Sequence, residues 1–93
     1  MINFIGLKDF AQLEKNKIKE LSNKYIEKLG TKGNLIVQCK KYNWGGRVKY
    51  SFHTRVESPD IILNAKNSDW ELKKCLHGLF NKLLREEEHK FKK

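Results

Sequence analysis

The stretch RVKYSFHTRV, residues 47–56, alternates between polar residues and mostly apolar ones. Successive side chains of a β-strand point to opposite faces of the sheet, so this alternation predicts a strand with one buried and one exposed face. The polar face would carry Arg47, Lys49, Ser51, His53 and Arg55, and the other face Val48, Tyr50, Phe52, Thr54 and Val56. The stretch therefore predicts a sheet that is covered on one side only, with cations on its other side.

Strands are also predicted on both sides of this one. Residues 34–42, NLIVQCKKY, would bury Leu35, Val37 and Cys39, and residues 61–66, IILNAK, would bury Ile61, Leu63 and Ala65. The intervening segments NWGG (43–46) and SPD (58–60) are typical of turns, and paired glycines allow the positive φ that tight hairpins need. We expect antiparallel pairing between these consecutive strands.

A period of 3.6 residues predicts two helices. The first would span residues 9–29 with Asp9 as N-cap and Gly30 after its end, and its apolar stripe is Phe10, Leu13, Ile18, Leu21, Tyr25, Ile26 and Leu29. The second would begin after a Ser68-x-x-Glu71 capping box. Its stripe is Leu72, Cys75, Leu76, Leu79, Phe80, Leu83 and Leu84. Gly78 interrupts this stripe, which either costs about 1 kcal/mol relative to Ala or allows close packing.

With a short first strand in MINFIG (1–6), the element order is β-α-β-β-β-α. Two amphipathic helices can cover one face of a four-stranded sheet, so the fold class expected is α+β, a two-layer sandwich with both helices on one face. The 93 residues are enough for one such domain, which would span residues 1–93. No stretch approaches the 18 apolar residues of a membrane span, and the N-terminus lacks a signal peptide pattern. The expected compartment is the cytoplasm.

Charge is the strongest feature of the composition. Lys and Arg number 20 against 11 Asp and Glu, for a formal net charge of +9. Such an excess favours a polyanionic partner, either nucleic acid or an anionic membrane. On the predicted open sheet face, Tyr42 and Trp44 lie beside the cations, as in RNA-binding surfaces. Such a face could equally be a solvated one that only protects the sheet from aggregation. The candidate residues on this face are Lys40, Arg47, Lys49, His53, Arg55 and Lys66.

Catalytic and metal-binding patterns are weak. The sequence has no nucleophile elbow, no phosphate-binding P-loop and no ligand spacing for structural zinc, and Gly30-Thr-Lys-Gly33 matches a KH-type GXXG loop in its glycines alone. Cys39 and Cys75 fall at apolar positions and are expected to be buried free thiols. We expect no enzyme, no metal, no cofactor and no small-molecule substrate.

The run from Arg47 to Lys92 resembles the ribosome hibernation-promoting factors, also called ribosome-associated translation inhibitors, in their short form. The likeness lies in SPD (58–60), IILNA (61–65), SDW (68–70) and the segment Asn81-Lys82-Leu83-Leu84-Arg85. The family has the same β-α-β-β-β-α order. The helix start, Asp69 to Lys74, departs from the family pattern D-M-Y-x-A-I, and the tail carries three glutamates. The C-terminal extension of long-form members does not follow, so we expect no ribosome pairing through it.

The resemblance implies binding of the small ribosomal subunit through its rRNA, in the channel for mRNA and tRNA, with inhibition of translation or protection of idle ribosomes. It adds helix residues to the candidate RNA-binding set. Together with the basic residues at the start of the second helix, these are Lys28, Lys73, Lys74, Lys82, Arg85 and Lys90. No membrane partner is expected. The alternatives are a general RNA-binding module that acts outside the ribosome and, third, a protein-interaction adaptor.

Overall fold

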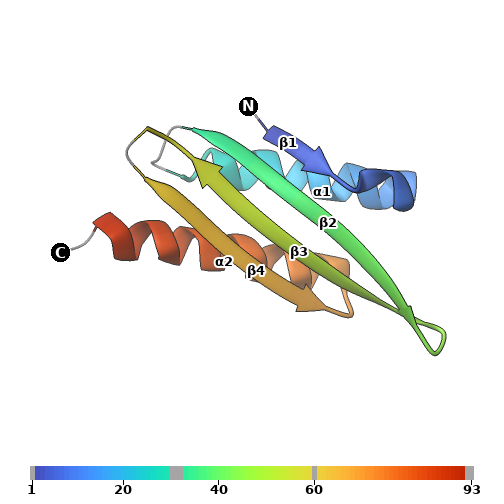
Figure 1. Ribbon diagram of the computed structural model, residues 1–93. Helices are drawn as coiled ribbons and strands as arrows, with labels where there is room; N and C mark the ends of the chain where they lie inside the picture. The colour runs from blue at the N-terminus through green and yellow to red at the C-terminus, as the bar shows by residue number, and fades with distance from the viewer. Residues whose placement is uncertain (1, 30–32, 60, 92–93) are drawn as a thin grey trace.

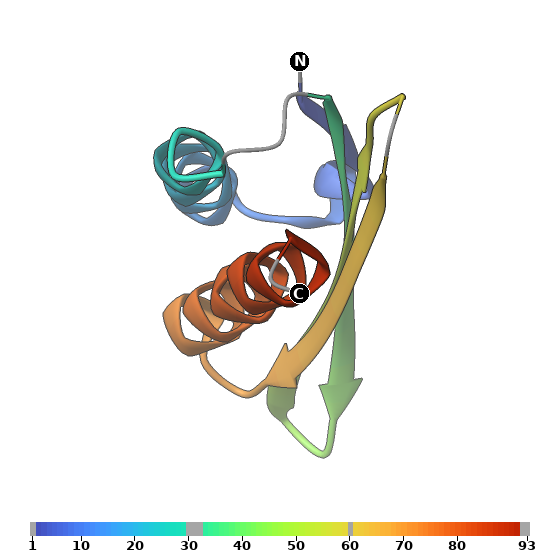
Figure 2. The same ribbon diagram turned by 90° about the vertical axis from the view of Figure 1, so that its left-hand side faces the viewer.

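The computed structural model describes residues 2–29, 33–59 and 61–91 (Figure 1). Its element order is β1 (Ile2–Ile5), the 3-10 helix η1 (Leu7–Asp9), α1 (Gln12–Ile26), β2 (Asn34–Trp44), β3 (Arg47–Glu57), β4 (Ile62–Asp69) and α2 (Leu72–Phe91). Both helices lie on the same side of the sheet, as the edge-on view in Figure 2 shows. The predicted α+β sandwich, with two helices on one face, is confirmed.

The sheet has the strand order β1-β2-β3-β4. β1 runs parallel to β2, and β2-β3-β4 form an antiparallel meander as predicted. The β2–β3 pairing is the longest, because it continues to the Trp44–Arg47 pair at the turn. Gly45 and Gly46 at this turn have φ values of 53° and 87°, and positive φ at both central positions is what a tight hairpin turn of type I′ requires.

The core lies between the sheet and the helices. β2 contributes Leu35, Val37 and Cys39, β3 contributes Phe52 and Val56, and β4 contributes Leu63 and Ala65, as the alternation predicted. From the helices come Ile18, Leu21, Tyr25, Cys75, Leu76, Leu79, Phe80 and Leu83. The apolar residues that recur every two positions in the strands therefore pack against those that recur every 3.6 positions in the helices, and together they form one core.

The first helix begins later than its sequence predicts. Asp9 is not the N-cap, because residues 7–9 form η1 and α1 starts only at Gln12, with Ala11 as its N-cap. Leu13, expected in the buried stripe, is 82% exposed. Gly30, expected to end the helix, lies outside the described residues. Phe10 is buried as predicted, but it reaches the core from the link between η1 and α1, where its ring lies against Tyr50 and Phe52.

The last strand ends later than predicted, and this removes the expected capping box. Ser68 belongs to β4, and its hydroxyl bonds to the Ser51 hydroxyl across the strand pair. Just before α2 begins at Leu72, the Asp69 carboxylate accepts the Glu71 N–H at 3.0 Å. The apolar stripe of α2 is confirmed, with Leu72 and Leu84 half-buried at its ends.

Gly78 allows a close approach between α2 and β4. A Cβ at this position would lie 2.3 Å from the Asn67 amide nitrogen. That amide donates to the Cys75 carbonyl at 2.9 Å, so the glycine leaves room for a side chain that bonds the helix to the strand. Close packing, one of the two expectations for Gly78, is the one observed.

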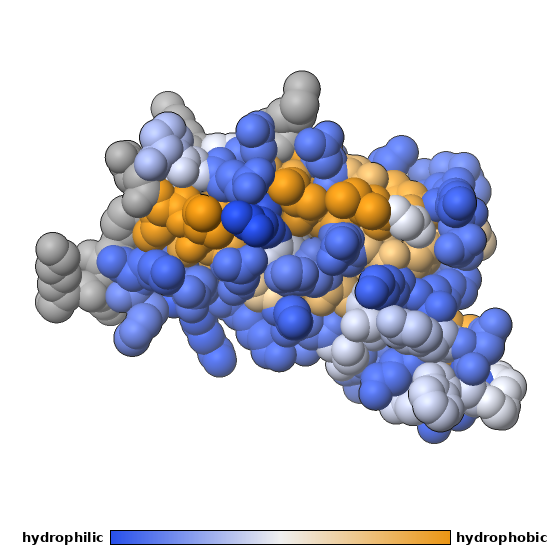
Figure 3. All heavy atoms as spheres, viewed as in Figure 1, coloured by the Kyte–Doolittle hydropathy of each residue, from blue (hydrophilic) through white to orange (hydrophobic). Residues whose placement is uncertain are grey.

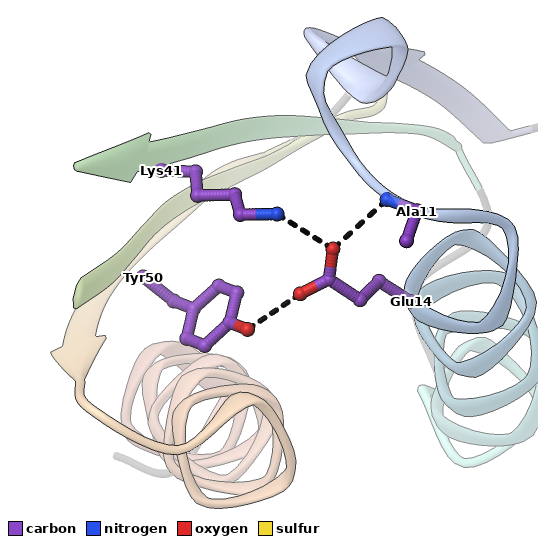
Figure 4. A network of polar contacts seen from close by, with 4 residues as sticks. All are labelled: Ala11, Glu14, Lys41 and Tyr50. Atoms are coloured by element: carbon purple, nitrogen blue, oxygen red, sulfur yellow. Dashed lines mark hydrogen bonds and ion pairs between the residues drawn. The ribbon is translucent and has the colours of Figure 1, made fainter. Parts of the chain in front are cut away.

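Glu14 joins the start of α1 to the sheet (Figure 4). Its carboxylate accepts bonds from the Lys41 ammonium at 2.7 Å, from the Tyr50 hydroxyl and from the Ala11 N–H at 2.9 Å. The side chain is only 19% exposed. Burial by itself raises the pKa of this carboxyl, but the three donors outweigh burial and hold the pKa below its ordinary value. Burial and the bond to Glu14 raise the pKa of Tyr50 to about 12.

We expect the Glu14→Gln substitution to lower the free energy of unfolding by about 2 kcal/mol at neutral pH, because it removes the charge that holds these donors. A depressed carboxyl pKa stabilises the folded state above the ordinary value of 4.5, and this contribution is lost as the pH falls through the folded-state pKa. The two proteins should therefore converge in stability as the pH falls below 4.5 and through the folded-state pKa. Urea unfolding followed by circular dichroism at several pH values measures both effects.

The control is Glu20→Gln on the same helix. Glu20 pairs with Lys17 at 3.7 Å but is 69% exposed, so its removal should change stability by less than about 0.5 kcal/mol. Equal losses for the two variants, or a loss for Glu14→Gln that persists unchanged at acidic pH, would contradict the role assigned to Glu14.

Candidate nucleic-acid interface

The sheet face opposite the helices carries the cations predicted from the strand pattern. We call it the open face. It is the side viewed in Figure 1 and Figure 3. Six candidate residues share it: Lys40 on β2, Arg47, Lys49, His53 and Arg55 on β3, and Lys66 on β4. The strand register brings them into rows, since His53 pairs with Gln38 on one side and Lys66 on the other. The prediction that these residues gather on one sheet face is confirmed.

Shallow depressions follow one another along the open face. One of about 240 Å³ is lined by Lys40, His53 and Lys66 together with Gln38, Tyr42, Ser51, Phe52 and Ser68. Another of about 160 Å³ lies between Ile36, Gln38, His53 and Arg55. A third of about 230 Å³ lies toward the hairpin end, between Tyr42, Trp44, Lys49, Ser51 and Ser68. They are open troughs that suit an extended or flat partner better than an enclosed small molecule.

Acidic residues are rare on this surface. Among the described strand residues of the open face, the carboxylate is Glu57, and it pairs with Arg55 at 3.2 Å. Hydrophilic residues cover much of the face in Figure 3, and hydrophobic patches interrupt them. Ile5 on β1 and Ile62 on β4 are about half exposed. The cations thus meet little competing negative charge, and the face is suited to a polyanion.

Aromatic residues cluster where the face reaches the β2–β3 turn. We call Tyr42, Trp44 and Trp70, with Arg47 and Lys49 between them, the aromatic end. Trp44 pairs with Arg47 and Tyr42 with Lys49 across the hairpin. The Arg47 guanidinium lies 4.4 Å and the Lys49 ammonium 5.4 Å from the centre of the Trp70 ring. Tyr42 and Trp44 were predicted beside the cations from the sequence, but Trp70 was not. The Ser68-Asp69 pair before it was interpreted as a helix cap, whereas it forms the end of β4.

The remaining candidates lie on the helix side of the molecule, away from the open face. Lys28 covers the Tyr25 ring at 4.9 Å, Lys74 pairs with Glu71 at 2.9 Å and Lys90 pairs with Glu86 at 3.8 Å. The bond to Glu71 raises the pKa of Lys74. Lys73 and Arg85 are exposed on α2.

Lys82 has a structural role that the sequence did not indicate. Its ammonium donates to the Lys66 carbonyl at 3.0 Å and to the Asn67 side-chain oxygen at 3.1 Å. It therefore joins α2 to β4. The candidate residues consequently form two sets on opposite sides of the protein, and the structure does not unite them in one patch.

The described residues offer little for catalysis or metal binding. No group of three or more His, Cys, Asp and Glu side chains within residues 2–29, 33–59 and 61–91 could hold a metal ion. His77 bonds to the Tyr25 hydroxyl at 2.8 Å between the helices, whereas His53 lies on the open face. In the same ranges, no helix combines the length and apolar character needed to cross a membrane.

Both cysteines are buried free thiols, as predicted. Burial and then the nearby Cys75 raise the pKa of the Cys39 thiol to about 12. Burial and the nearby Asp69 carboxylate raise the pKa of the Cys75 thiol to about 11. Since the thiolate is the reactive form, neither group is suited to act as a nucleophile at neutral pH.

Comparison with known proteins shows a likeness in fold. No protein family model and no curated protein sequence matches the chain. Among solved structures, it is similar to a ribosomal subunit interface protein from Coxiella burnetii, with a TM-score of 0.70 and 20% sequence identity. The match covers 98% of this chain and 98% of the other. The β-α-β-β-β-α fold is thus shared over the full length of both chains.

The burial of both thiols generates a direct chemical test. In the folded protein at pH 8, we expect Cys39 and Cys75 to react with a disulfide reagent such as Ellman's reagent only as fast as the protein opens. In denaturant, both should react within seconds, because the pKa returns to its ordinary range and the sulfur becomes accessible. The absorbance of the released thiolate measures both rates. Rapid labelling of either thiol under native conditions would contradict the burial described above.

Proposed function

We propose that this protein is a non-enzymatic, cytoplasmic RNA-binding protein that associates with the small ribosomal subunit through rRNA. It would occupy the channel used by mRNA and tRNA, and so inhibit translation or protect idle ribosomes. The observation that carries the proposal is the open face, where cations line shallow troughs with hardly any acidic competition.

Electrostatics supports an RNA partner for this face. Lysine and arginine side chains that neutralise phosphates release condensed counterions, which supplies much of the binding free energy at low salt. The formal net charge of +9 attracts such a partner from a distance, and the helix side contributes further cations. Cations on both sides of a slab-shaped molecule would suit a cleft with RNA on two walls. That is the environment the ribosomal channel would provide.

Two likenesses support the ribosome as the source of that RNA. The chain shares its fold over its full length with a protein described as a ribosomal subunit interface protein. Its C-terminal half also resembles the hibernation-promoting factors in SPD, IILNA, SDW and the segment from Asn81 to Arg85. Neither likeness identifies the rRNA contacts, so the roles of the individual cations belong to this proposal.

The aromatic end favours a second candidate function. Exposed rings between cations are typical of proteins that bind single-stranded RNA without regard to its source. A general RNA-binding module would bind arbitrary RNA as tightly as it binds ribosomes. A protein-interaction adaptor, the third alternative, would bind with little dependence on salt concentration.

The test is sedimentation of the protein with ribosomes and separated subunits through gradients over a salt series. We expect enrichment on the small subunit and on whole ribosomes. The logarithm of the binding constant should fall linearly with the logarithm of the salt concentration, by about 0.7 to 0.9 per phosphate contact. A protein that stays free of small subunits at low salt would contradict the proposal. Equal affinity for arbitrary RNA would favour the general module.

Matched charge reversals then test which side of the protein binds. Lys40→Glu with Lys66→Glu alters the open face, and Lys73→Glu with Arg85→Glu alters α2, with the same change in net charge. All four side chains are exposed. We expect the open-face pair to weaken subunit binding at least tenfold more than the helix pair. Equal effects would indicate that net charge alone matters, and the assignment of the open face would be wrong.

A further inference from the structure

We propose that the aromatic end is a stacking site for unpaired bases of single-stranded RNA, in which Tyr42, Trp44 and Trp70 hold base faces and Arg47 and Lys49 hold the adjoining phosphates. The inference rests on the proposed function, because it takes RNA as the partner, and it adds how part of that RNA is recognised. The inference adds base recognition to phosphate binding, because cations alone can bind phosphates without aromatic rings.

The exposure of the rings is the first observation. Trp44 is 64% exposed, Tyr42 45% and Trp70 39%. The ring-to-ring contacts found among the described residues lie in the core, at Phe10, Tyr25, Tyr50, Phe52, His77 and Phe80. The three rings of the aromatic end therefore contribute little to that core. Single exposed aromatic residues are common on protein surfaces, but a cluster of them typically marks a binding site.

The placement of the rings is the second observation. All three project from the same face of the sheet, on β2 and just after β4, with β3 between them. The trough of about 230 Å³ between Tyr42, Trp44 and Lys49 is smaller than the pockets that enclose drug-sized ligands, and it is open to solvent. Such a trough accommodates a flat group that slides in edgewise, which is the shape of a nucleobase.

The charges select RNA over an apolar partner. Arg47 and Lys49 lie over the Trp70 ring by cation–π contact and so cover one face of that ring. Their cross-strand partners are Trp44 and Tyr42, so their positive ends are held between Trp70 and these two rings. A guanidinium plane is itself a surface on which a base stacks. Away from the aromatic end, Lys40, His53 and Lys66 line the next trough along the sheet. A strand whose bases stack at the aromatic end would thus continue with its phosphates over these cations.

The positions of the tryptophans make the test specific. The chain has two, Trp44 and Trp70, and both belong to the aromatic end. The tryptophan emission of the whole protein therefore reports on this site. We titrate the protein with decauridylate and with a sugar-phosphate decamer that has the same charge but lacks bases. We expect strong quenching by decauridylate, and at the same salt a much smaller change from the decamer without bases.

Substitutions then assign the effect. Trp44→Ala should weaken decauridylate binding about tenfold or more, because stacking on one ring contributes roughly that factor per base. Binding of the decamer without bases, followed by fluorescence anisotropy of a labelled end, should stay unchanged. The control is Leu13→Ala, which alters an apolar residue on α1 that is even more exposed than Trp44, at 82% against 64%. This variant should bind both decamers like the unaltered protein. Circular dichroism verifies that each variant is folded.

The outcomes separate this inference from the proposed function. If the protein sediments with small subunits but both decamers quench alike, or Trp44→Ala binds decauridylate normally, the stacking site is wrong and the proposed function stands. If bases stack as expected but no ribosome binding occurs, the inference holds and the proposed function fails. Equal affinity and quenching with polyglutamate would overturn the inference in favour of an acidic protein partner.

Discussion

The register of β2 against β3 is the constraint on which the rest of the structure depends. Side chains alternate with a period of two, so a slip by one residue would move Phe52 and Val56 to solvent and bring His53 and Arg55 into the core. Positive φ at Gly45 and Gly46 gives the tight turn that holds the register at one end. With the register fixed, one side of the sheet is apolar and receives both helices. The other side then carries most of the polar and charged residues of the strands.

Most of the fold follows from periodicities that are local. The strand 47–57, the core residues of β2 and the stripe of α2 could be predicted because period two and period 3.6 extend over many residues there, even though Gly78 interrupts the helical stripe. The errors fall at element ends, where a residue has two uses. Asp9 and Ser68 are both residue types that commonly cap helices. In the structure, however, Asp9 belongs to η1 and Ser68 pairs with β3 as part of β4. Leu13 is exposed because it is out of phase with the buried face of α1. At 3.6 residues per turn, Glu14 and not Leu13 lies in line with Ile18 and Leu21.

The candidate site was predictable to the same extent as its strands. Alternation places the cations of β3 on one face of the sheet. The pairing of β3 with β2 and β4 then places Lys40 and Lys66 on the same face. Trp70 could not be found in this way, since its place on the open face depends on how far β4 continues. The bonds that Lys82 makes to β4 could not be predicted either, because they depend on how α2 packs against that strand. Basic residue type alone does not distinguish a cation that serves the fold from one that serves a ligand.

The outward reach of the β2–β3 hairpin leaves part of its backbone without a strand on either side. β1 accompanies β2 only as far as the Ile5–Gln38 pair, and β4 accompanies β3 only from Tyr50 onward. Unpaired strand edges are templates on which another copy of a protein can add, and lysines along an edge discourage this. Lys40 on one edge and Lys49 on the other are in position to repel a second copy. A bound polyanion would neutralise that repulsion, so occupancy of the open face removes the protection against self-association while covering the surface beside it.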